Sequence, residues 1–225
     1  TPNYYSLTLS LSKSFDNGFF SSIAYTRSRA RDLGATGGSQ AGSLWPSVVE
    51  SDRNNPELSF AGFDQPNRVI ANLSYRSKNT TLGLFYEGGE SGRYSYTYSG
   101  SGIRFGDGAN RLLYVPVDAN ELSYEEFTLG GVTYTAEDQA RIFNEFIDQD
   151  PYLSQRRGQI AERNGAVRPW VHRFDFRILQ DIFLTKNQKN KLQLSLDFTN
   201  VGNLFNSNWG IPQVQWQSNP LNLRR

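Results

Sequence analysis

Strict alternation of apolar and polar residues is the feature that most constrains the fold of this chain. Between Tyr5 and Ser12 every second residue is Tyr or Leu, and each residue between them is Ser or Thr. Successive side chains of a β-strand point to opposite faces, so this pattern predicts a strand with one apolar and one polar face. Five further segments show the same period. We expect six strands, at about residues 4–15, 19–29, 68–77, 80–99, 171–184 and 191–205.

The connections between these segments alternate in length. Short turns follow the first, third and fifth segments, at Asp16-Asn17-Gly18, at Lys78-Asn79 and over residues 186–190, and Asn and Gly favour such tight turns. Long connections, about residues 29–66 and 101–169, follow the second and fourth segments. If the strands run up and down, all short turns lie at one end and all long loops at the other. This asymmetry is typical of outer-membrane β-barrels, whereas compact soluble domains rarely carry structureless loops longer than about 12 to 15 residues.

Composition excludes several other classes of protein. The longest apolar run covers about six residues, 112–117, whereas a membrane-spanning helix needs roughly 18. Lys and Arg total 23 against 22 Asp and Glu, so the net charge of +1 provides no general field to attract nucleic acid. The chain has no Cys and one His, which removes disulfide frameworks, thiol catalysis and the usual zinc sites. We therefore expect no enzyme, no catalytic or metal site, no cofactor and no nucleic-acid partner.

The two faces of the expected strands fit two architectures. In a membrane barrel the apolar face meets lipid, and the opposite face of Ser, Thr, Asn, Gln, Asp and Arg lines a wet or plugged lumen. In a soluble β-sandwich the apolar face would be the core and the polar face the surface. The loop asymmetry favours an all-β, antiparallel transmembrane β-barrel segment. The expected lipid-facing residues are Leu7, Leu9, Leu11, Ile23, Val69, Leu73, Leu82, Leu84, Phe176, Ile178, Leu192, Leu194 and Leu196.

Four stretches of the sequence carry a resemblance to a known family. They are RLLYVP at 111–116, the run from FIDQDPYL at 146–153 to ERNG at 162–165, PWVHRFD at 169–175, and DFTNVGNLFN at 197–206. In this order they resemble the C-terminal part of the barrel of TonB-dependent outer-membrane receptors, specifically the Oar-like receptors of Bacteroidetes, which carry a carboxypeptidase-regulatory-like domain. The resemblance covers nearly the whole chain.

The resemblance implies a plugged barrel of 22 strands in the bacterial cell outer membrane. Such a receptor takes up a ligand with energy that TonB-ExbB-ExbD supplies through the plug. Residues 1–225 would be a partial C-terminal region of the barrel, with about six of its strands and without the plug domain. The implied partners are the lipid bilayer, lipopolysaccharide and a surface lipoprotein. The alternative function is that of a non-transporting surface adhesin or a barrel subunit of an outer-membrane secretion or attachment complex.

Ligand contacts are expected in the long loops, because rim loops carry recognition in proteins of this shape. A helix is expected between residues 135 and 150, with Thr135 as its N-cap and an apolar stripe that packs the loop on the rim or contacts a ligand. Each candidate side chain has a second interpretation: the tyrosines as an interfacial girdle or strand extension, the arginines as partners of loop carboxylates, and Trp45 as a loop anchor. The candidates are Trp45, Tyr94, Tyr96, Tyr98, Arg156, Arg157, Arg163 and Trp170.

Overall fold

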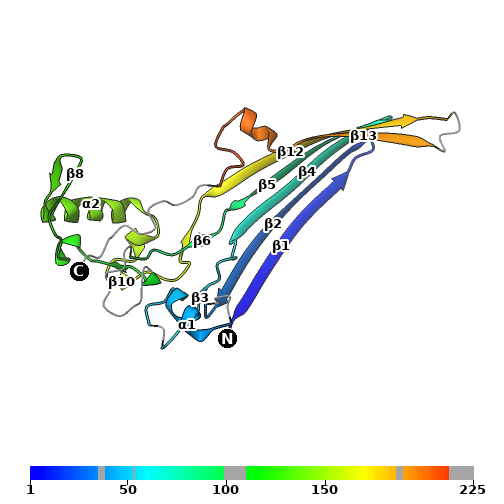
Figure 1. The fold of residues 1–225 in the computed structure, drawn as a ribbon. Coiled ribbons are helices and arrows are strands. Elements are labelled where there is room, and N and C mark those ends of the chain that lie inside the picture. Colours follow the sequence, from blue (N-terminus) through cyan, green and yellow to red (C-terminus); the bar gives the residue numbers. More distant parts are fainter. Residues whose placement is uncertain (35–38, 53, 99–109, 186–189, 213–225) are drawn as a thin grey trace.

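Six long strands form one antiparallel sheet in the computed structural model of the chain, which describes residues 1–34, 39–52, 54–98, 110–185 and 190–212 (Figure 1). They lie in the order β1-β2-β4-β5-β12-β13, and a short strand, β3 (Ser59–Phe60), adds to β2. The expected antiparallel β architecture is confirmed. The bounds of the long strands are β1 (Asn3–Ser14), β2 (Phe19–Asp32), β4 (Asn67–Ser77), β5 (Thr80–Glu90), β12 (Trp170–Phe183) and β13 (Lys191–Phe198).

Two of the expected strands end earlier than the alternation indicates. The strand expected over 80–99 ends at Glu90, because the chain turns at Gly92 with a φ of +120° and then forms β6 (Arg93–Tyr94), which pairs with β11 (Ala166–Val167) outside the main sheet. The strand expected over 191–205 ends at Phe198. Asn200 there has a φ of 55°, and a 3-10 turn, η5 (Val201–Leu204), follows. The turn expected over 186–190 lies mostly outside the described residues.

The register gives the sheet one apolar face and one polar face. One row across the apolar face runs through Leu11, Ile23, Ala71, Tyr86 and Phe174, which pair in turn on neighbouring strands. All of the residues expected to face lipid lie on this apolar face. Most are strongly exposed, with exposed fractions that reach 72% at Leu11. The polar face carries the Ser, Thr, Asn, Gln, Asp and Arg residues that alternate with them.

The remaining elements gather at the end of the sheet opposite the short turns (Figure 1). The first long connection contains α1 (Ala41–Leu44) and η1 (Trp45–Ser47). The second, which we call the loop module, covers the described residues between 91 and 169 and has its own hydrophobic core. Its other elements are β7 (Tyr114–Val115), η3 (Ala119–Glu121), β8 (Phe127–Leu129), β9 (Val132–Tyr134), α2 (Ala136–Gln149), η4 (Leu153–Gln155) and β10 (Gln159–Ile160).

The helix expected over 135–150 is confirmed as α2. Thr135 accepts a hydrogen bond from the Asp138 amide and the Asp138 carboxylate accepts one from the Thr135 amide, which forms a capping box. The apolar stripe of the helix buries Ala140, Phe143 and Ile147 in the core of the loop module. The helix therefore packs its loop together, as one of the two interpretations predicts. Within the described residues, no helix has the length and apolar character to cross a bilayer.

Candidate functional site

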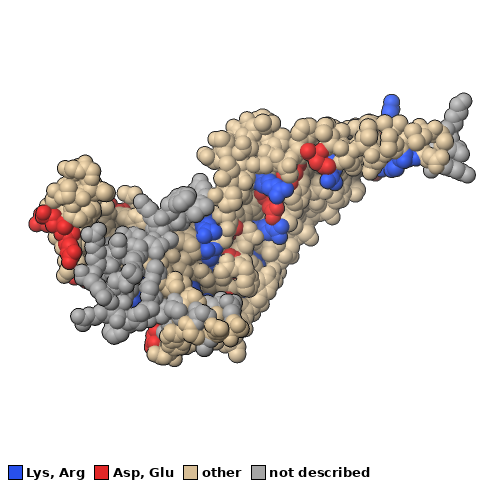
Figure 2. All heavy atoms as spheres, viewed as in Figure 1, with Lys and Arg blue, Asp and Glu red and all other residues tan. Residues whose placement is uncertain are grey.

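Oppositely charged side chains are interspersed on the polar face of the sheet (Figure 2). Arg68 pairs with Glu87 at 2.6 Å across β4 and β5, and Arg173 pairs with Asp175 at 2.6 Å within β12. Arg177 donates to the carboxylate of its register partner Asp197 on β13. These ion pairs neutralise most of the charge on this part of the polar face. The face therefore presents hydrogen-bonding groups without a strong excess of positive or negative charge.

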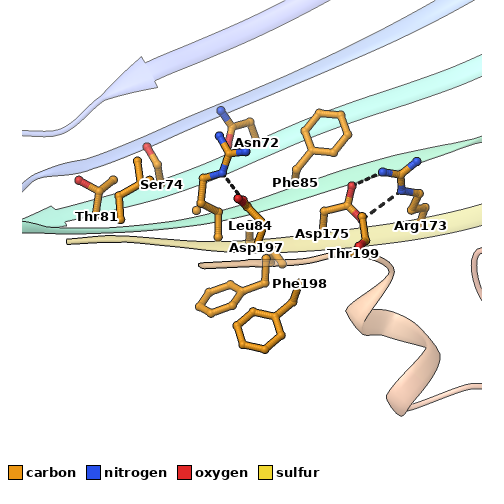
Figure 3. Close-up of a pocket in the computed structure, with 14 residues that line it drawn as sticks. Asn72, Ser74, Thr81, Leu84, Phe85, Arg173, Asp175, Asp197, Phe198 and Thr199 are labelled. Atoms are coloured by element: carbon orange, nitrogen blue, oxygen red, sulfur yellow. Dashed lines mark hydrogen bonds and ion pairs between the residues drawn. The ribbon is translucent and has the colours of Figure 1, made fainter. Parts of the chain in front are cut away.

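A half-open hollow of about 540 Å³ lies along β4, β5, β12 and the end of β13. Its polar wall is built by side chains such as Asn72, Ser74, Thr81 and Asp175 (Figure 3). Figure 3 shows Asp175 and Arg173 on one side of the strands and Phe198 on the other side. The hollow is not evident from the sequence alone, although the alternating charges at positions 173, 175 and 177 are a local signal for it.

A second polar cluster lies closer to the short turns. Asp181, which is 6% exposed, accepts hydrogen bonds from Gln193 at 2.7 Å and Lys191 at 3.2 Å. The Arg76 guanidinium lies 3.6 Å from the same carboxylate. On the polar face the cluster ties β12 to β13 by hydrogen bonds and β4 to β12 by an ion pair.

Aromatic side chains border the apolar face at both ends. At the short-turn end, the rings of Phe19 and Tyr75 lie 4.4 Å apart. At the loop end, Phe174 lies 4.8 Å from Tyr86 and 5.2 Å from Trp209. The Tyr86 hydroxyl and the Nδ1 atom of His172 are 2.9 Å apart and share a hydrogen bond. The register row between these two borders contains Leu73 and Leu84, with Ser21 at one side and the ring pair of Phe176 and Phe198 at the other.

The three candidate tyrosines belong to the core of the loop module. Tyr96 is fully buried and its hydroxyl donates to the Asp150 carboxylate at 2.5 Å. Burial, together with this hydrogen bond, strongly raises the pKa of the Tyr96 phenol. Tyr94 and Tyr98 pack against the same core. The prediction of Tyr96 as a ligand contact is wrong, because the turn at Gly92 directs this strand of alternating tyrosines into the loop module instead of along the rim.

The three candidate arginines are held by carboxylates of the chain itself. Arg163 has a side chain that is 7% exposed, 2.7 Å from Asp32 and 3.1 Å from Glu50. Arg156 pairs with Glu162 at 3.0 Å, and Arg157 pairs with Asp148 at 2.7 Å. The interpretation as loop ion pairs is confirmed for Arg156, since Glu162 is a carboxylate of the same loop.

For Arg163 the prediction of a ligand contact is wrong, because the side chain is buried between two segments of the chain. Burial raises the pKa of its partner Glu50, against the opposing effect of the guanidinium charge. Trp45 and Trp170, with exposed fractions of 51% and 39%, keep accessible rings and remain predicted ligand contacts. Arg157 also donates to the Val117 carbonyl at 2.9 Å, so part of its binding capacity is used within the module.

A buried ion pair that sequence reasoning missed joins the two long connections. The Nε atom of Arg93 donates to Asp64 at 2.6 Å, and the two side chains are 7% and 0% exposed. The second oxygen of Asp64 accepts the amide of Ala30 at 2.7 Å. The Arg93 guanidinium also lies 3.8 Å from the ring centroid of Phe60. No local pattern marks these residues, because they come from three segments that only the fold brings together.

The described residues contain no group of three or more His, Cys, Asp or Glu placed to hold a metal ion. No family model matches the chain, and neither a curated protein nor a solved structure is found to be similar to it.

Proposed function

We propose that this chain forms part of the wall of a transmembrane β-barrel, in an outer-membrane transporter that captures an external ligand with TonB-derived energy. One observation carries the proposal. The register gathers the alternating apolar residues of all six strands on a single exposed face, with aromatic residues at both ends. A lipid-facing surface of a barrel has this pattern: an apolar band between two aromatic girdles.

The lengths of five of the six long strands agree with this proposal, whereas β13, with 8 residues, is shorter. A tilted membrane-spanning strand needs about 9 to 11 residues. β4 and β5 have 11 residues each, and β1, β2 and β12 have 12, 14 and 14 residues. In this arrangement the extra length of β2 and β12 carries the strands beyond the bilayer to the loop module.

The open edges of the sheet also agree with a barrel. Among the strands that the structure describes, β1 and β13 each pair with a long strand on one side only. An unpaired edge in hydrocarbon leaves backbone groups without partners, so further strands of the barrel must cover both edges. The polar face, with its paired charges, would then line the interior of the barrel.

The transport step rests on the family resemblance and on the position of the loop module. Outer-membrane barrels keep short turns in the periplasm and long loops outside. The exposed rings of Trp45 and Trp170 would therefore lie on the external side, where a ligand arrives. A surface adhesin would share this topology but would not depend on TonB.

Spin labels on β13 test the orientation of the two faces. The chain has no Cys, so Leu194→Cys and Leu196→Cys place labels on the apolar face, and Gln193→Cys and Ser195→Cys place matched labels on the polar face. In full-length protein in outer membranes, we expect the first pair to be reached by oxygen dissolved in lipid and the second pair by a water-soluble nickel chelate. Equal access of the chelate to all four labels would refute a lipid-facing surface.

A second experiment separates transport from adhesion. Small molecules that co-purify with the full-length protein are identified by mass spectrometry, and their uptake is compared in cells with and without TonB. We expect uptake only in cells that contain TonB. Surface retention of the molecule that is equal in both strains, without uptake, would favour the adhesin.

A further inference from the structure

Three arginines follow one another on the apolar face of β2, directly beyond its apolar band. On this face β2 presents Ile23, Tyr25, Arg27, Arg29 and Arg31 in order towards the loop end. Arg27 and Arg29 are exposed and Arg31 is half-buried. Residues two apart on one strand lie about 7 Å apart, so the arginine row, Arg27, Arg29 and Arg31, extends over roughly 13 Å.

The surroundings of the arginine row show that it lies on the same surface as the apolar band. The register partners on the edge strand β1 are Leu7 for Arg27, Tyr5 for Arg29 and Asn3 for Arg31. Leu7 and Tyr5 are 64% and 66% exposed. The row therefore starts beside aliphatic and tyrosine side chains, and its first two members, Arg27 and Arg29, are open to the surroundings.

Carboxylates do not neutralise the arginine row within the part of the chain that the structure describes. The nearby Asp64 pairs with Arg93, and Asp32 and Glu50 pair with Arg163. The contacts of the row are instead to neutral groups. Arg27 donates to the Asn67 side chain at 2.8 Å, whereas Arg29 and Arg31 lie over the Phe60 ring at 5.7 Å and 4.8 Å.

These contacts position the three arginine side chains without neutralising their positive charge. Stacking on an aromatic ring uses the face of a guanidinium and leaves the N–H groups at its edge free to donate. The Nε atom of Arg31 is buried and has no hydrogen-bond partner among the described residues, so the donors that a ligand can reach belong mainly to the exposed Arg27 and Arg29. A fixed row of cations with free donors is suited to phosphate oxygens, which accept charge-assisted and bidentate hydrogen bonds from Arg.

We propose that the arginine row binds the phosphorylated headgroup of a membrane lipid at the outer surface of the barrel. This inference rests on the proposed function, because only a lipid-facing apolar band places the row at the level of the headgroups. Tyr25, between the band and the row, occupies the level at which aromatic side chains border a bilayer. Cations near a membrane surface each strengthen binding to anionic lipid by about five-fold, so three arginines contribute on the order of 100-fold.

Native mass spectrometry of the full-length protein in detergent tests the proposal, with lipid A and dephosphorylated lipid A as probes. We expect Arg27→Gln, Arg29→Gln and Arg31→Gln together to weaken lipid A binding on the order of 100-fold, and to leave binding of the dephosphorylated form unchanged. Arg29→Gln alone, which removes only the long contact to Phe60, should weaken it about five-fold. The control is Arg141→Gln on α2, a 59% exposed arginine away from the apolar face, which should bind as the parent does.

Several results would overturn the proposal. Equal lipid A binding by the parent and both Gln variants would show that the arginine row is not part of the lipid-binding site. Inorganic phosphate is added at the same concentration at which lipid A saturates the protein. If it displaces lipid A at that concentration, the row is a site for free phosphate. Heat-modifiable migration and recovery in outer membranes are measured for every variant. A parent protein that does not insert would refute the proposed function, whereas an inserted protein with variant-independent lipid binding would refute the arginine row alone.

Discussion

Replacement of Asp64 by alanine should destabilise the junction between the two long connections far more than its size suggests. The carboxylate is completely buried, 2.6 Å from the Nε atom of Arg93, and its other oxygen accepts the Ala30 amide. Asp64→Ala leaves a buried guanidinium without a counter-charge, which costs about 3 to 5 kcal/mol. Opening of this region should therefore become roughly 10² to 4 × 10³-fold more frequent.

Hydrogen exchange of the full-length protein in outer membranes or nanodiscs measures this cost at single amides. The Ala61 amide donates to the Ala30 carbonyl at 3.0 Å and reports on opening of the junction. The matched control is Asp148→Ala. Asp148 accepts from Arg157 at 2.7 Å, nearly the same distance, but its side chain is 67% exposed, so its loss should cost less than about 1 kcal/mol.

A double variant distinguishes charge burial from simple loss of contact. Asp64→Ala combined with Arg93→Met removes the unpaired charge. It leaves the Ala30 amide unpaired, which costs about 1 to 3 kcal/mol, and removes the two long 3.3 Å bonds from Arg93 to the Asn164 and Gly165 carbonyls. The double variant should therefore be more stable than Asp64→Ala alone. A double variant less stable than either single variant would refute the argument from charge burial.

Three further predictions address the sheet, the loop module and α2. Leu194→Arg should cost about 2 to 4 kcal/mol near the bilayer midplane and Gln193→Arg much less; denaturant titration with heat-modifiable migration checks this, and similar losses would count against a lipid-facing surface. Burial raises the pKa of Tyr124 to about 12. The neutral phenol therefore stabilises the fold below about pH 10, and this stabilisation is lost as the pH rises through the raised pKa. The difference in absorbance between the parent and Tyr124→Phe reports ionisation of the phenol, and ionisation near pH 10 would contradict the prediction. Thr135→Ala should destabilise the start of α2 by about 1 kcal/mol, measured by faster exchange of the Asp138 amide, and an unchanged rate would exclude a contribution of the capping box.

The strands and their faces could be predicted from the sequence because both depend on local information. Alternation with a period of two fixes which residues share a face, and tight turns such as Asp16-Asn17-Gly18 fix the pairing of consecutive strands. Once β1 and β2 are joined in this way, Leu11 must lie opposite Ile23, as the register shows. The position of α2 was predictable for a similar reason, since Thr135 and the apolar stripe are signals within one helix.

The candidate site was less predictable because its contacts are not local. Alternation continues through Tyr94, Tyr96 and Tyr98, but period alone cannot say to which sheet a strand belongs, and the turn at Gly92 moves these residues into the loop module. An arginine in a loop looks accessible until its partners are known. Arg163 is buried because Asp32 and Glu50, far away in the sequence, enclose it.

The ion pair between Arg163 and Asp32 also sets a limit on the order of folding. The two residues are 131 positions apart in the chain, and contacts between distant segments form late because closing a long loop costs entropy before the contact is made. Asp32 is held by β2, and Arg163 immediately precedes β11 and β12. We therefore expect the pair to form after β12 has docked beside β5. On this order the loop module matures after the sheet, and a folding intermediate carries a formed sheet with its long connections still open to proteases.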